Sequence, residues 1–102
     1  MADLPAAIFR RWLHSREEDS PSERVYRTAE FQFRPSRGRT GFEIHPDGTF
    51  VAVGIGPADG QRARRGHWRA EHGTIRVRYD DGGDQVLRVV AVDDEVLRIA
   101  AD

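Results

Sequence analysis

The segment at residues 41–53, GFEIHPDGTFVAV, constrains the fold of this chain more than any other. Pro46 presets the backbone for a type I turn, and Gly48 suits the left-handed position that closes a three-residue hairpin loop. In that register His45 pairs with Thr49, and one face of the hairpin becomes wholly apolar. That face carries Phe42, Ile44, Phe50 and Ala52. The segment therefore predicts an antiparallel hairpin with one buried face.

A second hairpin is predicted with His72 and Gly73 as its turn. Its apolar side is Trp68, Ala70, Ile75, Val77 and Tyr79, and its other side is His67, Arg69, Arg76 and Arg78. This division is typical of a half-buried antiparallel sheet. Turns at residues 80–84 and 93–95 predict two more strands. On these strands we expect Leu87, Val89 and Ala91 to share a face with Leu97, Ile99 and Ala101.

The chain as a whole contains about seven or eight short strands in consecutive hairpins. Such a series favours closure into an up-and-down barrel, because closure removes unpaired strand edges. Residues 5–15 fit either a short helix or an opening strand, and the helical spacing of their apolar residues slightly favours a helical turn. We expect this N-terminal segment to close one end of the barrel. The predicted fold is all-β, with a single small antiparallel barrel domain over residues 1–102.

The composition narrows the possible classes of function. The chain has 16 basic and 17 acidic residues and a formal charge of −1, so no overall field favours a nucleic acid or an anionic membrane as partner. It has no cysteine, which excludes disulfides, thiolate metal ligands and cysteine nucleophiles. No apolar run suits a signal peptide or approaches the ~20 residues of a membrane span. We therefore expect a soluble cytoplasmic protein that needs no cofactor.

Several short strings give the chain a resemblance to a known group of proteins. They are WLHSREED at 12–19, VYR at 25–27, SRGR at 36–39, DGTF at 47–50, GIGPAD at 54–59 and GHW at 66–68. Together they resemble a group of small bacterial lipocalin-like proteins of unknown function. Trp12 with Arg98 also resembles the lipocalin (calycin) signature, in which an early tryptophan packs under a late arginine, although Arg10 replaces the usual glycine. The resemblance implies a barrel and a ligand.

The string at residues 36–39 is a candidate anion site. Arg37 and Arg39 flank a glycine, so a tight turn would let both guanidinium groups point to one place. One hypothesis is a clamp for a carboxylate or phosphate at the mouth of the barrel. The alternative, which we favour from the charge balance, is that these arginines pair with the chain's own acidic loop. The acids of that loop are Glu17, Glu18 and Asp19.

The aromatic residues are candidates for contact with the body of a ligand. Those we select are Trp12, Tyr26, Phe42 and Trp68. Eight strands enclose an interior just wide enough for side chains or one small ligand, so the same rings are also expected to fill the barrel. Tyr26 and Trp68 are the preferred ligand-facing residues because each combines an apolar ring with a polar group.

Metal binding and catalysis receive less support from the sequence. His14, Glu17 and Glu18 offer donors that zinc or manganese accepts, but their spacing matches no established motif, and a solvated charged loop is favoured. The glycines of residues 54–60 fail the nucleotide-binding spacing and favour a bend in the barrel. Ser15 or Ser36 with His14 and Asp59 lacks the context of a catalytic triad.

The leading hypothesis is therefore non-catalytic binding of a small, partly apolar and possibly anionic ligand. The alternative is a structural or interaction protein with a filled barrel. In that case Val51, Val53 and Ile55 would form an outward apolar stripe for a partner or a homodimer. A third class, less favoured, is a barrel enzyme of the cyclase or isomerase type.

Overall fold

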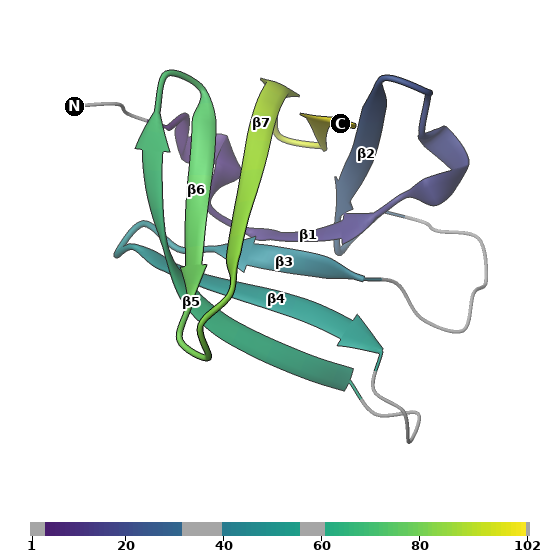
Figure 1. The fold of residues 1–102 in the computed structure, drawn as a ribbon. Helices are drawn as coiled ribbons and strands as arrows, with labels where there is room; N and C mark the ends of the chain where they lie inside the picture. The colour runs from purple at the N-terminus through teal and green to yellow at the C-terminus, as the bar shows by residue number, and fades with distance from the viewer. Residues whose placement is uncertain (1–3, 32–39, 56–60, 102) are drawn as a thin grey trace.

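The fold is a closed antiparallel β-barrel (Figure 1). The computed structural model describes residues 4–31, 40–55 and 61–101, and the predictions for Ser36, Arg37, Arg39 and Asp59 lie outside these ranges. The strands are β1 (Arg11–His14), β2 (Glu23–Thr28), β3 (Gly41–Ile44), β4 (Thr49–Ile55), β5 (Gln61–Glu71), β6 (Thr74–Tyr79), β7 (Asp84–Val92) and β8 (Val96–Ala100), with two 3-10 helices, η1 (Ala6–Ile8) and η2 (Arg16–Glu18). The predicted all-β barrel is confirmed.

The order of the strands around the barrel is β1-β2-β8-β7-β6-β5-β4-β3. From β3 to β8, neighbours in the sequence are neighbours in the sheet, as the hairpins predicted. The order differs at β1, which pairs with both β2 and β3 and so lies between them. β2 and β3 are therefore parallel to each other on either side of β1, with Thr28 and Phe42 both opposite Trp12, an arrangement that a simple up-and-down order does not contain.

The two hairpins predicted from turn chemistry have the predicted registers. Phe42 pairs with Ala52 and Ile44 with Phe50, and Gly48 adopts the expected positive φ of 98°. The β5–β6 pairs also agree with the prediction. The β7–β8 pair differs, because a bulge between Val89 and Ala91 shifts the register. Ala91 therefore pairs with Arg98 and is exposed, so the prediction that it shares the inner face was wrong.

The N-terminal segment packs against the core at one end of the barrel. Ile8 is fully buried, and its carbonyl oxygen accepts a hydrogen bond of 3.0 Å from Trp12 Nε1. Phe9 lies with its ring centroid 5.9 Å from that of Trp68, and Arg10 Nη1 donates to the carbonyl of Asp94 in the β7–β8 turn. These contacts agree with the prediction that this segment closes one end, which we call the η1 end.

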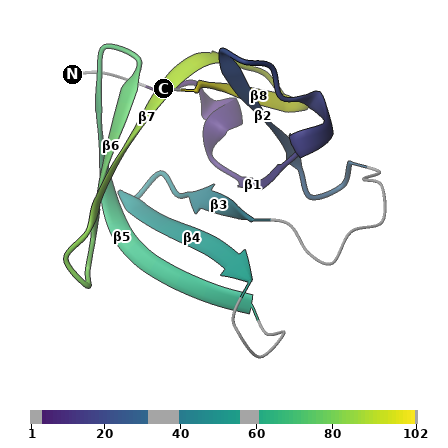
Figure 2. The ribbon, with the colours of Figure 1, turned by 45° about the vertical axis from the view of Figure 1, so that its right-hand side comes forward.

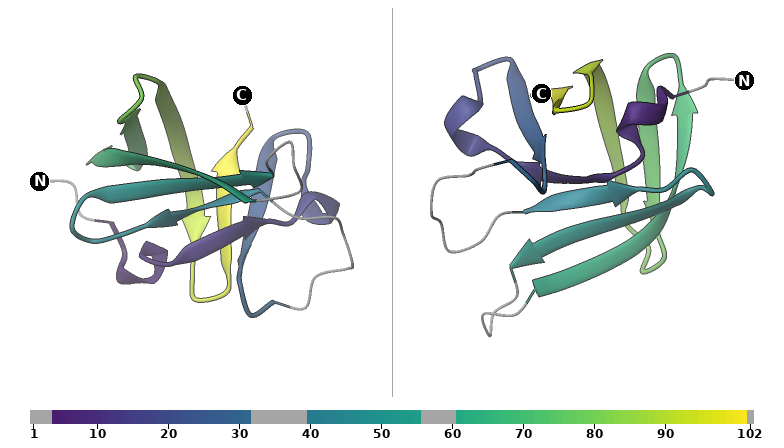
Figure 3. Two further views of the ribbon diagram at one scale, coloured as in Figure 1. Left: turned by 90° about the horizontal axis from the view of Figure 1, so that it is seen from below. Right: turned by 180° about the vertical axis from the view of Figure 1, so that it is seen from behind.

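Because neighbouring strands are antiparallel, η2, the β6–β7 turn and the C-terminal end of β8 belong to the other end of the barrel, which we call the η2 end. Figures 2 and 3 show η2 on the opposite side of the barrel from the β5–β6 hairpin. Two glycines allow backbones to approach closely within the wall. A Cβ atom on Gly41 would lie 2.0 Å from the carbonyl oxygen of Trp12, and one on Gly66 would lie 2.5 Å from that of Arg78. Only glycine fits at either position.

Candidate functional site

A row of aromatic rings crosses the inside of the barrel. Tyr26 on β2 lies 4.8 Å from Phe42 on β3, and Phe42 lies 5.4 Å from Phe50 on β4, measured between ring centroids. Phe50 in turn meets Tyr79 on β6 edge to face at 6.1 Å. All four residues are at most 7% exposed. These rings fill the middle of the barrel and have the spacing of favourable aromatic pairs.

Polar groups stand at the Tyr26 end of this row. His14 stacks on Tyr26 with centroids 5.0 Å apart, and its Nε2 lies 2.8 Å from Asp19 Oδ2. Burial raises the pKa of the Tyr26 hydroxyl, and the nearby Arg24 guanidinium opposes that rise. Arg24 and Tyr26 are two residues apart on β2, so their side chains lie on the same face of the strand.

Arg64 stands at the Tyr79 end of the row. Its guanidinium carbon lies 4.0 Å from the Tyr79 ring centroid, and its Nε and Nη2 groups donate to the two carboxylate oxygens of Asp81 at 2.8 and 2.7 Å. This bidentate pair lowers the pKa of Asp81. A Cβ atom on Gly83 would lie 2.2 Å from Arg64 Nη2, so the absence of a side chain there leaves room for the guanidinium.

Beside Arg64 lies a hollow of about 560 Å³, lined by Ala52, Gly54, Ala63, Arg64 and Asp81. We call it the Arg64 hollow. It lies at the η2 end, where β4 ends and β5 begins. A Cβ atom on Gly54 would meet nothing within 4 Å, so the hollow is open at that strand. Its volume is within the range of pockets that bind small molecules.

The structure divides the predicted ligand residues into separate groups. Tyr26 and Phe42 belong to the aromatic row, which runs from β2 to Tyr79 next to the Arg64 hollow. Trp12 is fully buried beneath η1. Trp68 packs against Phe9 and donates a hydrogen bond of 2.7 Å to the carbonyl of His45, also at the η1 end. Trp12, Tyr26 and Phe42 nevertheless belong to one hydrophobic core, and Trp68 packs against it. Contact of these four residues with a ligand stays a prediction.

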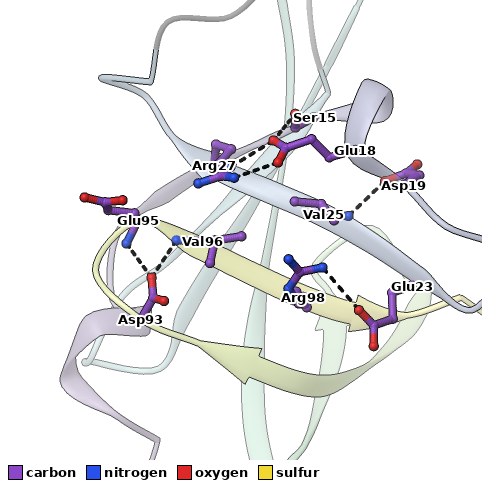
Figure 4. Close-up of polar contacts among 10 residues, drawn as sticks. All are labelled: Ser15, Glu18, Asp19, Glu23, Val25, Arg27, Asp93, Glu95, Val96 and Arg98. Atoms are coloured by element: carbon purple, nitrogen blue, oxygen red, sulfur yellow. Dashed lines mark hydrogen bonds and ion pairs between the residues drawn. The ribbon is translucent and has the colours of Figure 1, made fainter.

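The predicted acidic loop includes η2, and two of its acids, Glu18 and Asp19, contact residues of β1 and β2. Glu18 accepts hydrogen bonds from Arg27 Nε at 2.9 Å and Nη2 at 2.6 Å, and one from Ser15 Oγ at 2.8 Å (Figure 4). Asp19 accepts the backbone N–H of Val25. The Arg27 guanidinium lowers the pKa of Glu18, although partial burial opposes this effect. The described ion-pair partner of Glu18 is thus Arg27, an arginine that the sequence analysis did not select.

The candidate metal-binding and catalytic residues that the structure describes make other contacts. In the described part of the chain, no three histidine or acidic side chains are grouped so that they could hold a metal ion. His14 is turned to Asp19 and Glu18 to Arg27. Ser15 Oγ donates to Glu18 and not to a histidine, so the described residues contain no serine–histidine pair at Ser15.

The predicted outward stripe of β4 is only partly present. Val53 is 7% exposed in the single chain, so the expectation that it forms part of an exposed patch was wrong. Val51 is half-buried, and the side chain of Ile55 is not described. Association through this face stays a prediction.

No protein-family model matches this chain, and neither a curated protein nor a solved structure matches it. None of the helices in the described ranges is long and apolar enough to cross a membrane.

The eight-stranded closed barrel is consistent with a calycin-like fold. Among the described contacts, the guanidinium over the Trp12 ring is that of Arg10 at 5.9 Å, whereas Arg98 pairs with Glu23.

Arg64 is the site residue that sequence reasoning missed. Every second side chain of a strand lies on the same face. Arg64 therefore lies on the same inner face of β5 as Trp68 and Ala70. A charged residue in register with an apolar inner face is a recognisable signal of a polar group at a barrel end. The residues assigned to the predicted hairpin did not extend back to Arg64.

Proposed function

We propose that this protein binds a small, partly apolar, anionic ligand without transforming it, and that the Arg64 hollow is the binding site. The observation that carries this proposal is the position of Arg64, which lies at the edge of a hollow of ligand size and stacks on the last ring of the aromatic row. The resemblance to small lipocalin-like proteins supports binding as the class of function.

The contacts of Arg64 leave it able to take an anion. Asp81 occupies Nε and Nη2, and a guanidinium has five N–H donors. Nη1 makes no hydrogen bond within the described residues, so a carboxylate or sulfonate can bind there while Asp81 stays in place. The apolar walls at Ala52 and Ala63 suit the body of the same ligand.

The proposal is tested with 1-anilinonaphthalene-8-sulfonate, a fluorescent probe that joins an apolar ring system to one anionic group. We expect saturable binding to the folded protein. Arg64→Gln should weaken it about tenfold, since a charge-assisted hydrogen bond contributes about 1.5–3 kcal/mol. Gly54→Leu should weaken it by a similar factor, because the new side chain occupies the hollow and has space to do so.

Arg65→Gln is the matched control, because Arg65 is the next residue along β5, is exposed, and does not line the hollow. It carries the same charge change and should alter the affinity by less than twofold. Circular dichroism and thermal unfolding of each variant check that the barrel is intact. Equal losses for Arg64→Gln and Arg65→Gln, or unchanged binding by Gly54→Leu, would overturn the proposal.

A further inference from the structure

Two arginines lie directly opposite each other on the outer face of the barrel. Arg69 on β5 pairs in register with Arg76 on β6, and both side chains are exposed. Directly opposite side chains have Cβ atoms about 4.5–5.5 Å apart, and like charges at that distance are destabilising. The sheet therefore carries an unfavourable contact that an anion between the two guanidinium groups would relieve.

The neighbouring charges do not neutralise both arginines. Arg76 Nε lies 3.8 Å from Glu71 Oε2, in an exposed pair. Arg78, the next outward-facing residue of β6, has an acidic partner of its own, because its Nε lies 3.4 Å from Asp84 Oδ1. Arg69, in contrast, has no ion pair or side-chain hydrogen bond with any residue of the described part of the chain. A full positive charge is thus left beside a second one that is only weakly paired.

The same place on the outer face is hollowed. The hollow has a volume of about 570 Å³ and is lined by residues of β5, β6 and β7, including Arg69, Arg76 and Val86. Val86 pairs in register with Arg76 and is 49% exposed. Trp68, Val77 and the ion-paired Arg78 and Asp84 line it as well. The guanidinium groups of Arg69 and Arg76 and the apolar side chain of Val86 therefore meet in one depression.

We propose that this outer hollow binds a phosphate monoester. The dianionic phosphate would lie between Arg69 and Arg76, and the apolar part of the ester would lie on Val86. Guanidinium groups hold phosphate oxygens through paired N–H donors, and two of them match the two charges of a monoester. This site shares no lining residue with the Arg64 hollow, so it does not depend on the function proposed above.

The test is a titration of the ¹⁵N-labelled full chain with phenyl phosphate, followed by NMR. We expect saturable shifts of the amides near Arg69, Arg76 and Val86. Arg69→Gln and Arg76→Gln should each weaken binding about tenfold or more, as expected for the loss of a charged hydrogen bond. Arg65→Gln should change it less than twofold, because Arg65 lies outward on the same strand, also has no ion pair with any residue that the structure describes, and does not line the hollow.

Inorganic phosphate tests the anionic group without the apolar part of the ester. It should bind to the same residues, and several-fold more weakly than phenyl phosphate. Equal affinities would overturn the role of Val86, and equal losses for Arg69→Gln and Arg65→Gln would show diffuse attraction and overturn the site. In phosphate-free buffer Arg69→Gln should melt at or above the wild-type temperature, because it removes a repulsion. A lower melting temperature there would contradict the unfavourable contact on which the proposal rests.

Discussion

The Arg64 guanidinium lies 4.0 Å from the centroid of the Tyr79 ring, and it holds this position while it pairs with Asp81 through two N–H groups. Burial raises the pKa of the Tyr79 hydroxyl, so this ring stays neutral at physiological pH. The arrangement places a fixed positive charge where the aromatic core of the barrel meets the surface. Asp81 both orients that charge and partly neutralises it, and the two effects can be separated by mutation.

Asp81→Asn should increase the affinity for 1-anilinonaphthalene-8-sulfonate about threefold to tenfold, because the amide no longer repels the sulfonate or shares the charge of Arg64. The measurement is a fluorescence titration at low and moderate salt. Asp80→Asn is the control, since Asp80 is the adjacent residue and pairs with His67 at 3.4 Å. If both variants raise the affinity equally, net charge is the cause. If neither does, Asp81 has no influence on the site.

Gly41 and Gly66 lie where two backbones approach closely, whereas Gly54 has open space around it. Gly66→Ala places a Cβ atom 2.5 Å from the carbonyl oxygen of Arg78, so β5 and β6 must move apart. We expect a loss of about 1–3 kcal/mol in the free energy of unfolding, as for other overpacked sites. Gly54→Ala, with nothing within 4 Å, should leave that free energy unchanged or raise it by up to about 1 kcal/mol. Urea denaturation measures both, and equal effects would contradict this geometry.

The sequence predicted those parts of the fold that depend on local chemistry. The turn at Gly48 and the alternation around it set the register of β3 and β4, because a one-residue slip would turn every apolar side chain outward. The position of β1 between β2 and β3 depends on a long connection whose course no turn motif specifies. The bulge that turns Ala91 outward could not be predicted either, because bulges add a residue without a sequence signature of their own at this position.

The candidate site was only partly predictable for a related reason. Arg64 and Asp81 are 17 residues apart in the sequence, and they meet because β5 and β6 form a hairpin whose far ends lie side by side. The aromatic residues were selected correctly as inward-facing. Whether such a ring contacts a ligand or only its neighbours depends on the closure of the barrel, and periodicity along one strand holds no information about that.

Trp12→Phe should lower the free energy of unfolding by about 2–3 kcal/mol, because it leaves a small cavity and removes one of the two donors to the Ile8 carbonyl, the other being the backbone N–H of Arg10. Trp12 is fully buried, whereas Trp68 is half-buried and donates a similar hydrogen bond to His45. Trp68→Phe is therefore the matched control and should lower this free energy less. Guanidinium denaturation followed by far-ultraviolet circular dichroism measures both variants. A larger loss for Trp68→Phe would show that η1 does not anchor the barrel through Trp12.

The pair between Glu18 and Arg27 should make stability depend on pH. Arg27 lowers the folded-state pKa of Glu18 from its ordinary value of 4.5, so the pair stabilises the fold above that pH and is lost as the pH falls through the folded pKa. Arg27→Gln should remove about 0.5–1 kcal/mol at pH 7, a small value because the pair is partly exposed to solvent. The difference between wild type and variant should shrink between pH 5 and 3. Arg24→Gln, on the same strand, should show no such convergence, and a constant difference for Arg27→Gln would mean that the pair makes no pH-linked contribution.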